Sequence, residues 1–401
     1  MTDRSRDIER LADLAVRFGA NVQPGQILVV GAEVGQESLV RAIARAAYEH
    51  GAKFVDATYF DMYVKRERLL HAAEDTLGFI PSWYSDRLLA IGDQRCARIG
   101  LSGTAHPHAL DGVDPQRAAL DQLPFLPEAA KVVNDRTTNW CAIAGPSPGW
   151  ASLVFPDMSP DEAEDRLWGQ VLHVLRLDED DPVEAWRARS ETLKGAAERM
   201  TSRRFDAVHF SGPGTDLTVG LLPSSQWMAA EFSTLDGIVH MPNLPTEEIF
   251  TTPDPERVDG EVRSTKPLEL HGTIIRGLRV RFEGGRAVAF DADENGDALA
   301  GYAQHDDGAS RLGEVALVDA EGRIGPLDTV FYDTLLDENA ASHIALGSAY
   351  RFTVEDEADH PRANVSGIHV DFMVGGPDVD VTGITREGER VPVLLGGRWQ
   401  I

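Results

Sequence analysis

The pattern of predicted secondary structure changes near residue 200 of this 401-residue chain, and this change constrains the fold more than any other feature. Before it, amphipathic helices alternate with short apolar strands, and Gly51 is placed to end one of the helices. This βαβ order favours a parallel sheet with helices on its faces. The segments that carry the pattern are a helix near 8–15, a strand over 26–32, a helix over 38–52, a strand over 52–60 and a capped helix over 159–177.

After residue 200 the chain consists of short strands separated by turns, with one helix predicted over 337–352. A length of 401 residues exceeds the roughly 250–300 at which a single core stops growing. The sequence therefore predicts the α/β class with two domains, a parallel-sheet α/β domain over 1–200 and a β-rich α+β domain over 201–401. The strands expected in the second domain lie within 207–221, 273–290, 314–324 and 367–376.

The charge and the cysteine content of the chain exclude several kinds of partner and of structural site. The chain carries 65 acidic and 38 basic residues, a net charge of −27, which argues against nucleic-acid and anionic-membrane partners. No window is long and apolar enough to span a bilayer, and no signal peptide is evident at the N-terminus. Only Cys96 and Cys141 are present, so a disulfide framework and a four-thiolate zinc site are excluded, and a reducing, cytoplasmic location is predicted.

Several titratable residues occur in apolar β-segments. In GIHVDFMVGG, alternation places His369 and Asp371 on one face of a strand and the apolar residues on the other. In RLGEVALV, Glu314 shares a face with Ala316 and Val318. A buried acid must be paired or ligated. For each segment taken alone, a hydrogen-bonded pair or an outward polar face is the favoured interpretation.

Two further segments add candidates. In the predicted helix over 337–352, Asp337 is placed to cap the start, Glu338 lies near the entry, and His343 and Tyr350 are seven residues apart on one face. Glu247 and Glu248 follow Pro245 in a turn-like position, where carboxylates are usually solvated. Together, four carboxylates and two imidazoles suit two hard or borderline divalent ions.

The motifs that contain these residues resemble those of the thermophilic aminopeptidase family, which comprises dinuclear metallopeptidases of the aminopeptidase T and aminopeptidase S type. They occur in family order, and the N-terminal βα pattern also fits the family. The motifs are GTDLTVGL (214–221), NLPTEEIF (243–250), STKPL (264–268), GASRLGEVALV (308–318), DENAASHIALGSAY (337–350) and GIHVDFMVGG (367–376).

The resemblance implies a metal-dependent aminopeptidase whose metal-binding domain is the C-terminal one. It places the catalytic tyrosine at Tyr350 and implies a homodimer acting on peptides with a free N-terminus. It places the ligands of two divalent ions at Glu248, Glu314, Glu338, His343, His369 and Asp371.

The ligand types leave the metal open among zinc, cobalt, manganese and magnesium. In a two-metal mechanism a carboxylate bridges the ions, for which Glu314 is the first candidate and Asp371 the second. Glu247 is the best sequence candidate for proton transfer to the leaving amine, and a simple turn acid is an equally good interpretation of it.

Two other functions compete with this prediction. A related group of ring-cleaving dioxygenases holds one iron with two histidines and a carboxylate, a set that His343, His369 and Asp371 would satisfy. Such an enzyme would not need the three glutamates at 248, 314 and 338, and all are present. A non-catalytic scaffold would have lost ligands, and none is lost.

Overall fold

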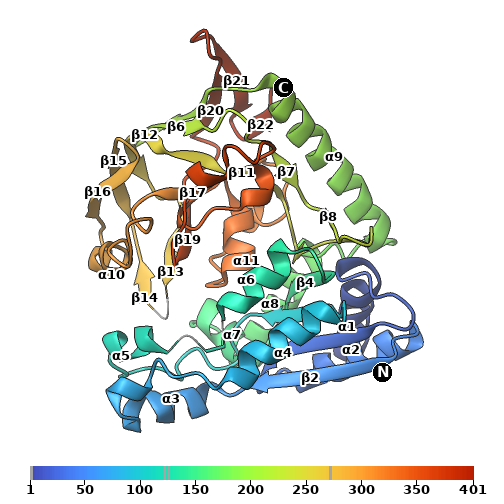
Figure 1. Cartoon of the computed structure of the whole chain (residues 1–401). Helices are drawn as coiled ribbons and strands as arrows, with labels where there is room; N and C mark the ends of the chain where they lie inside the picture. The colour runs from blue at the N-terminus through green and yellow to red at the C-terminus, as the bar shows by residue number, and fades with distance from the viewer. Residues whose placement is uncertain (1–2, 122, 125, 271–272) are drawn as a thin grey trace. The chain divides into compact units, whose positions relative to one another are not determined.

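The computed structural model describes residues 3–121, 123–124, 126–270 and 273–401 (Figure 1). The chain divides into two compact units, each built from two segments: Met1–Ala185 with Glu231–Pro245, and Trp186–Ala230 with Thr246–Ile401. The domain boundary near residue 200 stays a prediction, because compact units do not by themselves define independently folding domains. The two units are described separately.

The first unit contains a five-stranded parallel sheet with strand order β10-β4-β3-β1-β2. This confirms the parallel sheet predicted from the βαβ order. Strands β10 and β2 form the two edges of the sheet, and the core-facing residues of β1, such as Leu28 and Val30, are fully buried. The strands are β1 (Ile27–Glu33), β2 (Phe54–Phe60), β3 (Ala97–Ser102), β4 (Trp140–Ala144) and β10 (Asn243–Leu244), with a separate hairpin of β8 (Phe232–Ser233) and β9 (Val239–His240).

Helices connect these strands, and their ends follow local capping chemistry. Gly51 follows α2 with a φ of +93°, a conformation that favours glycine over residues with a Cβ atom. At the start of α8, the Glu162 carboxylate accepts hydrogen bonds from the Ser159 hydroxyl (2.6 Å) and backbone N–H (3.3 Å). The helices are α1 (Asp3–Leu14), α2 (Glu37–Glu49), α3 (Met62–His71), α4 (Ser82–Asp93), α5 (Pro115–Leu120), α6 (Pro127–Asn134), α7 (Pro148–Val154) and α8 (Pro160–Val174).

A buried histidine in this unit predicts a pH-dependent stability. His240 is 4% exposed and packs near Trp140 and Phe232, and burial lowers its pKa from 6.5 to about 4. Above pH 6.5 the His240 imidazole is unprotonated in both the folded and the unfolded chain. Between pH 6.5 and about pH 4 it is protonated only in the unfolded chain, so the free energy of unfolding falls as the pH is lowered through this range. Between about pH 7.5 and pH 5 the loss from this residue is about 2 kcal/mol.

Urea unfolding at these two pH values measures the effect. The loss between them should be smaller by about 2 kcal/mol in His240→Phe than in the wild type. The control, His108→Gln, replaces an exposed histidine and should retain the wild-type pH dependence. An unchanged pH dependence in His240→Phe would contradict the assignment.

The second unit is built mainly from two antiparallel sheets. One has five strands in the order β19-β18-β17-β11-β7, and the other has eight in the order β16-β15-β12-β6-β5-β20-β21-β22. Glycine turns join neighbouring strands, as at Gly284 and Gly285, whose φ values are +54° and +84°. The β-rich character predicted for the second half is confirmed.

The bounds of its elements are α9 (Pro182–Arg203), which lies almost entirely in this unit, β5 (Ala207–Gly212), β6 (Thr215–Leu221), β7 (Met228–Ala229), β11 (Glu248–Thr251), β12 (Pro253–Arg263), β13 (Leu268–Leu270), β14 (Thr273–Ile275), β15 (Arg279–Glu283), β16 (Arg286–Asp291), α10 (Gly296–Tyr302), β17 (Leu312–Val318), α11 (Thr334–Asp337), β18 (His343–Gly347), β19 (His369–Met373), β20 (Asp380–Ile384), β21 (Arg390–Leu395) and β22 (Arg398–Trp399).

The prediction of a helix over 337–352 is wrong. Helix α11 ends at Asp337, a 3₁₀ turn covers Glu338–Ala340, and His343–Gly347 forms strand β18. The cap of α11 is Asp333, not Asp337. The apolar segment of β18 is fully buried between β17 and β19, and hydrogen bonding on both sides outweighs its helical spacing. No helix among the described residues combines the length and the apolar character needed to cross a membrane.

Candidate metal centre

One face of the five-stranded sheet collects most of the predicted metal ligands. Directly paired residues of antiparallel strands project to the same face, and side chains alternate along each strand. Glu248 pairs with Val318 across β11 and β17, and His343 pairs with Ala316 across β18 and β17. Ala345 pairs with both Glu314 and Asp371. Four adjacent strands therefore present Glu248, Glu314, His343, His369 and Asp371 on one face.

These side chains meet at short distances. His343 Nε2 lies 3.1 Å from Glu248 Oε2, and His369 Nε2 lies 3.2 Å from Glu314 Oε2 and 3.4 Å from Asp371 Oδ1. They form two groups, Glu248–Glu314–His343 and Glu314–His369–Asp371, and within each the ligand atoms lie within 4.8 Å of one another. Glu314 belongs to both groups, which is the position expected of a bridging carboxylate.

Both imidazoles are oriented by main-chain carbonyl groups. The Nδ1 atom of His343 lies 3.2 Å from the carbonyl oxygen of Ala341, and that of His369 lies 2.8 Å from the carbonyl oxygen of Ser348. Because a carbonyl oxygen only accepts hydrogen bonds, we assign a proton to each Nδ1 atom. Each Nε2 atom is left to face the carboxylates, an arrangement typical of metal-ligating histidines.

Glu338 reaches the same cluster from the 3₁₀ turn after α11. Burial raises the pKa of Glu338 well above its ordinary value, and the charges of Asp371, Glu248 and Glu314 raise it further. Glu338 belongs to neither of the two ligand groups, but the 3₁₀ turn that carries it packs against β19, the strand of His369 and Asp371. The buried Asp337 holds the preceding turn, because its carboxylate accepts hydrogen bonds from the backbone N–H groups of Phe331 (2.8 Å) and Asp333 (3.2 Å).

The charge of the cluster fits divalent cations. Among the described residues, none of its four carboxylates forms an ion pair with lysine or arginine. Burial raises the pKa of Glu314. Burial alone would lower the pKa of His343, but the negative charges of Glu248 and Asp371 raise it. With neutral imidazoles, the four carboxylates carry negative charge that divalent cations would balance.

Comparison with known proteins identifies the family. The model of a family described as "Thermophilic metalloprotease (M29)" matches residues 4–399. The chain belongs to this thermophilic metalloprotease family. This confirms the resemblance found in the sequence motifs. Membership of a metalloprotease family implies a divalent metal cofactor, in agreement with the ligand types and the unbalanced charge of the cluster.

Relatives match over nearly the full length. Aminopeptidase T of Thermus aquaticus is 40% identical over 405 residues, covering 99% of each chain, and aminopeptidase 2 of Geobacillus stearothermophilus is 36% identical, covering 98% of each. The solved structure of wild-type AmpT from Thermus thermophilus superposes with a TM-score of 0.92 at 40% identity, covering 99% of each chain. The mixed α/β fold is therefore shared with AmpT from Thermus thermophilus.

Tyr350 lies beside the cluster of this thermophilic metalloprotease. Its ring centroid is 5.2 Å from that of His369, 5.4 Å from that of Phe352 and 5.8 Å from that of Phe250. The hydroxyls of Thr252 and Thr353 donate to its carbonyl oxygen at 3.0 and 2.8 Å, which fixes the main chain. The residue as a whole is 36% exposed.

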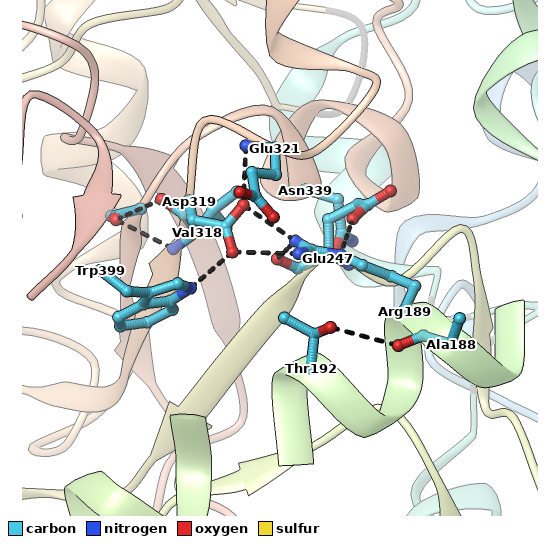
Figure 2. A network of polar contacts seen from close by, with 10 residues as sticks. Ala188, Arg189, Thr192, Glu247, Val318, Asp319, Glu321, Asn339 and Trp399 are labelled. Atoms are coloured by element: carbon cyan, nitrogen blue, oxygen red, sulfur yellow. Dashed lines mark hydrogen bonds and ion pairs between the residues drawn. The ribbon is translucent and has the colours of Figure 1, made fainter. Parts of the chain in front are cut away.

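Glu247 occupies a different environment from Glu248. Its side chain is fully buried, and Oε2 accepts a hydrogen bond of 2.5 Å from Arg189 Nε (Figure 2). The sequence reasoning missed Arg189, whose guanidinium also binds Asp319. A signal was available, because Arg189 falls on the buried face of α9 with Trp186 and Leu193. An arginine at a core position of an amphipathic helix indicates a buried acidic partner.

Proposed function

We propose that this chain is a metal-dependent aminopeptidase that removes N-terminal residues from peptides and uses two divalent ions. The observation that carries the proposal is the pair of ligand groups sharing Glu314 on one sheet face. The aminopeptidase names of its relatives support the substrate class. The single-iron ring-cleaving alternative is not favoured, because a site with one iron has no use for three further buried or half-buried glutamates.

The proposed ligand roles follow from the grouping. Glu314 would bridge the two ions. Glu248 and His343 would hold one of them, His369 and Asp371 the other, and Glu338 would add a fourth carboxylate. When bound, two divalent ions would polarise the scissile carbonyl and provide hydroxide from water at neutral pH. Carboxylates and imidazoles of this kind accept zinc, cobalt, manganese or magnesium.

Tyr350 is the proposed donor to the developing oxyanion. A phenol hydroxyl placed at the rim of the cluster donates a hydrogen bond to the carbonyl oxygen as negative charge builds on it. The free amino group of the substrate would ligate an ion or pair with a carboxylate of the cluster. Either contact selects peptides that have an unblocked N-terminus, which makes the enzyme an exopeptidase.

A substrate pair tests the proposed activity. Protein loaded in turn with each of the four metals is assayed with a leucyl anilide and with its N-acetyl derivative. We expect hydrolysis of the free-amine substrate, loss of at least about 10²-fold with the acetylated one, and two ions per chain by elemental analysis. Equal rates on the two substrates would contradict the exopeptidase assignment. Oxygen uptake with a catechol and one iron per chain would favour the dioxygenase instead.

We also propose a homodimer. Exposed aromatic side chains are concentrated on and around edge strand β2 and helices α3 and α4 of the first unit, including Phe54 (55%), Phe79 (67%) and Trp83 (67%). Exposed apolar groups next to an unpaired strand edge are typical of a protein interface. Sedimentation at micromolar concentration should give a dimer, and Phe79→Ser combined with Trp83→Ser should shift it toward monomer by at least about tenfold in Kd. A wild-type monomer would exclude the dimer.

We also propose a cytoplasmic location, based on the state of the two cysteines. Both Cys96 and Cys141 are free and buried, and burial raises the pKa of both thiols. Inert reduced thiols of this kind agree with a reducing compartment. Fractionation of the source cells that placed the protein outside the cytoplasm would contradict this location.

A further inference from the structure

A buried ionic network centred on Arg189 includes residues that are next in sequence to candidate metal ligands (Figure 2). Arg189 on α9 donates from Nε to Glu247 Oε2 at 2.5 Å, and from Nη1 and Nη2 to the two oxygens of Asp319 at 3.0 and 3.1 Å. Its Nη2 atom also lies 3.3 Å from the carbonyl oxygen of Glu247. The exposed fractions are 7% for Arg189, 0% for Glu247 and 5% for Asp319. One guanidinium therefore binds two acidic residues in the protein interior.

This network is joined to the main chain beside two candidate ligands. Glu247 immediately precedes Glu248, and its backbone N–H donates to Asn339 Oδ1 at 2.6 Å. Asn339 immediately follows Glu338, and its side-chain amide donates to the carbonyl oxygen of Leu335 at 3.0 Å. The segments that carry Glu248 and Glu338 are thus tied to each other through the Glu247–Asn339 hydrogen bond.

The remaining contacts anchor the network to the sheet and to the end of the chain. Asp319 directly follows β17, the strand that carries Glu314. Trp399 Nε1 donates to Asp319 Oδ2 at 2.5 Å, and the backbone N–H of Glu321 donates to Asp319 Oδ1 at 2.8 Å. Figure 2 shows the Trp399 indole and the Arg189 guanidinium converging on the Asp319 carboxylate from different elements.

Strand alternation separates Glu247 from the ligand cluster. Because Glu248 projects onto the ligand face of the sheet, the residue before it projects to the opposite side, where its carboxylate binds Arg189. Proton transfer by Glu247 would require this carboxylate to leave Arg189 and would leave a buried arginine with a single acidic partner. Breaking a buried pair of this kind is strongly unfavourable, because it leaves a buried charge without full compensation.

We propose that Arg189 is a positioning residue that, through Glu247, Asp319 and Asn339, holds the main-chain segments of Glu248, Glu314 and Glu338 in the geometry that binds the metal ions. This inference rests on the proposed metal centre and assigns Glu247 a positioning role instead of proton transfer. Partners that orient metal ligands typically contribute about 10–100-fold to metal affinity. The fixed fork of arginine matches two acceptors at once, which lysine does not.

Metal affinity provides a readout separate from activity. The dissociation constant for zinc is measured by competition with a chromophoric chelator in the wild type, Arg189→Met and Arg189→Lys. We expect affinity to fall about 10–100-fold in Arg189→Met and by a smaller factor in Arg189→Lys. The matched control is Arg362→Met, which also leaves a buried acid, Asp254, without its arginine partner at 2.6 Å. It should destabilise the fold and leave zinc affinity unchanged.

Thermal melts separate positioning from a purely structural role. A structural role lowers Tm equally with and without metal, whereas positioning also reduces the rise in Tm that metal produces. If Arg189→Met does not fold, Arg189→Lys and Trp399→Phe decide the question, because Trp399→Phe removes the indole donor to Asp319 and keeps an aromatic side chain. Unchanged zinc affinity in both of these variants would overturn the inference.

Glu247→Gln distinguishes positioning from proton transfer. At saturating zinc, a positioning residue leaves kcat within about tenfold of the wild type and the shape of the pH profile unchanged. Loss of a proton-transfer group lowers kcat about 10²–10⁴-fold and removes a limb of the profile, which would overturn the assignment. A wild type that binds zinc without hydrolysing peptides would refute only the proposed activity. A wild type that binds no metal would refute both proposals.

Discussion

Replacing Glu314 by glutamine is expected to abolish metal binding at both groups and to lower kcat/KM by more than about 10³-fold. Glu314 is the only residue common to both ligand groups among the described residues, so a neutral amide there weakens both sites together. The expected loss exceeds the about 10–100-fold that supporting residues contribute, because the change removes a ligand charge directly. Metal content by elemental analysis after gel filtration and initial rates on an aminoacyl anilide measure the effect.

The control is Glu261→Gln, which neutralises an exposed glutamate on β12 of the same unit. It should keep wild-type metal content and wild-type activity. A Glu314→Gln protein that retained two ions per chain would exclude Glu314 as the bridge and leave Asp371 as the remaining candidate. Retention of a single ion would also contradict the prediction, because the two groups would then bind independently.

Replacing Tyr350 by phenylalanine is expected to lower kcat by about 10²–10³-fold with unchanged metal content. Phenylalanine keeps the ring that packs beside His369, Phe352 and Phe250 and removes only the hydroxyl. KM should change little, because the proposed hydrogen bond strengthens only as charge develops on the carbonyl oxygen. Steady-state kinetics combined with elemental analysis measure both quantities.

Tyr332→Phe is the matched control, since Tyr332 belongs to the same unit and its hydroxyl lies 3.5 Å from Arg276. Its kinetics should equal those of the wild type. Equal turnover of Tyr350→Phe and the wild type would remove Tyr350 from the mechanism. Loss of metal from Tyr350→Phe would instead assign the phenol to the support of His369.

Period-two alternation in the sequence predicted which side chains share a strand face. Glu314 was predicted to share a face with Ala316 and Val318, and His369 with Asp371, and the register of β17, β18 and β19 agrees. The helical spacing of His343 and Tyr350 led to a wrong helix prediction. Strand β18 is a central strand, and its pairing on both sides outweighs local preference.

Glu247 marks the limit of local sequence reasoning. As one of two consecutive acids after a proline, it was predicted either to transfer protons or to be a simple turn acid. In the fold it is fully buried against Arg189, which lies 58 residues earlier in the chain, while Asp319 lies 130 residues after Arg189. No local pattern encodes such pairings. An arginine on the apolar face of α9 indicated only that some acidic partner exists.

The sequence by itself determined the α/β class, the strand faces and, through family motifs, the residues proposed to bind metal. These features depend on side-chain alternation, capping residues and residue types, all of which are local. Only the tertiary structure decided that Glu314 joins both ligand groups, that both histidines direct Nε2 toward the carboxylates, and that Glu247 binds Arg189. These features depend on strand register and on burial, which arise when distant segments pack and exclude water.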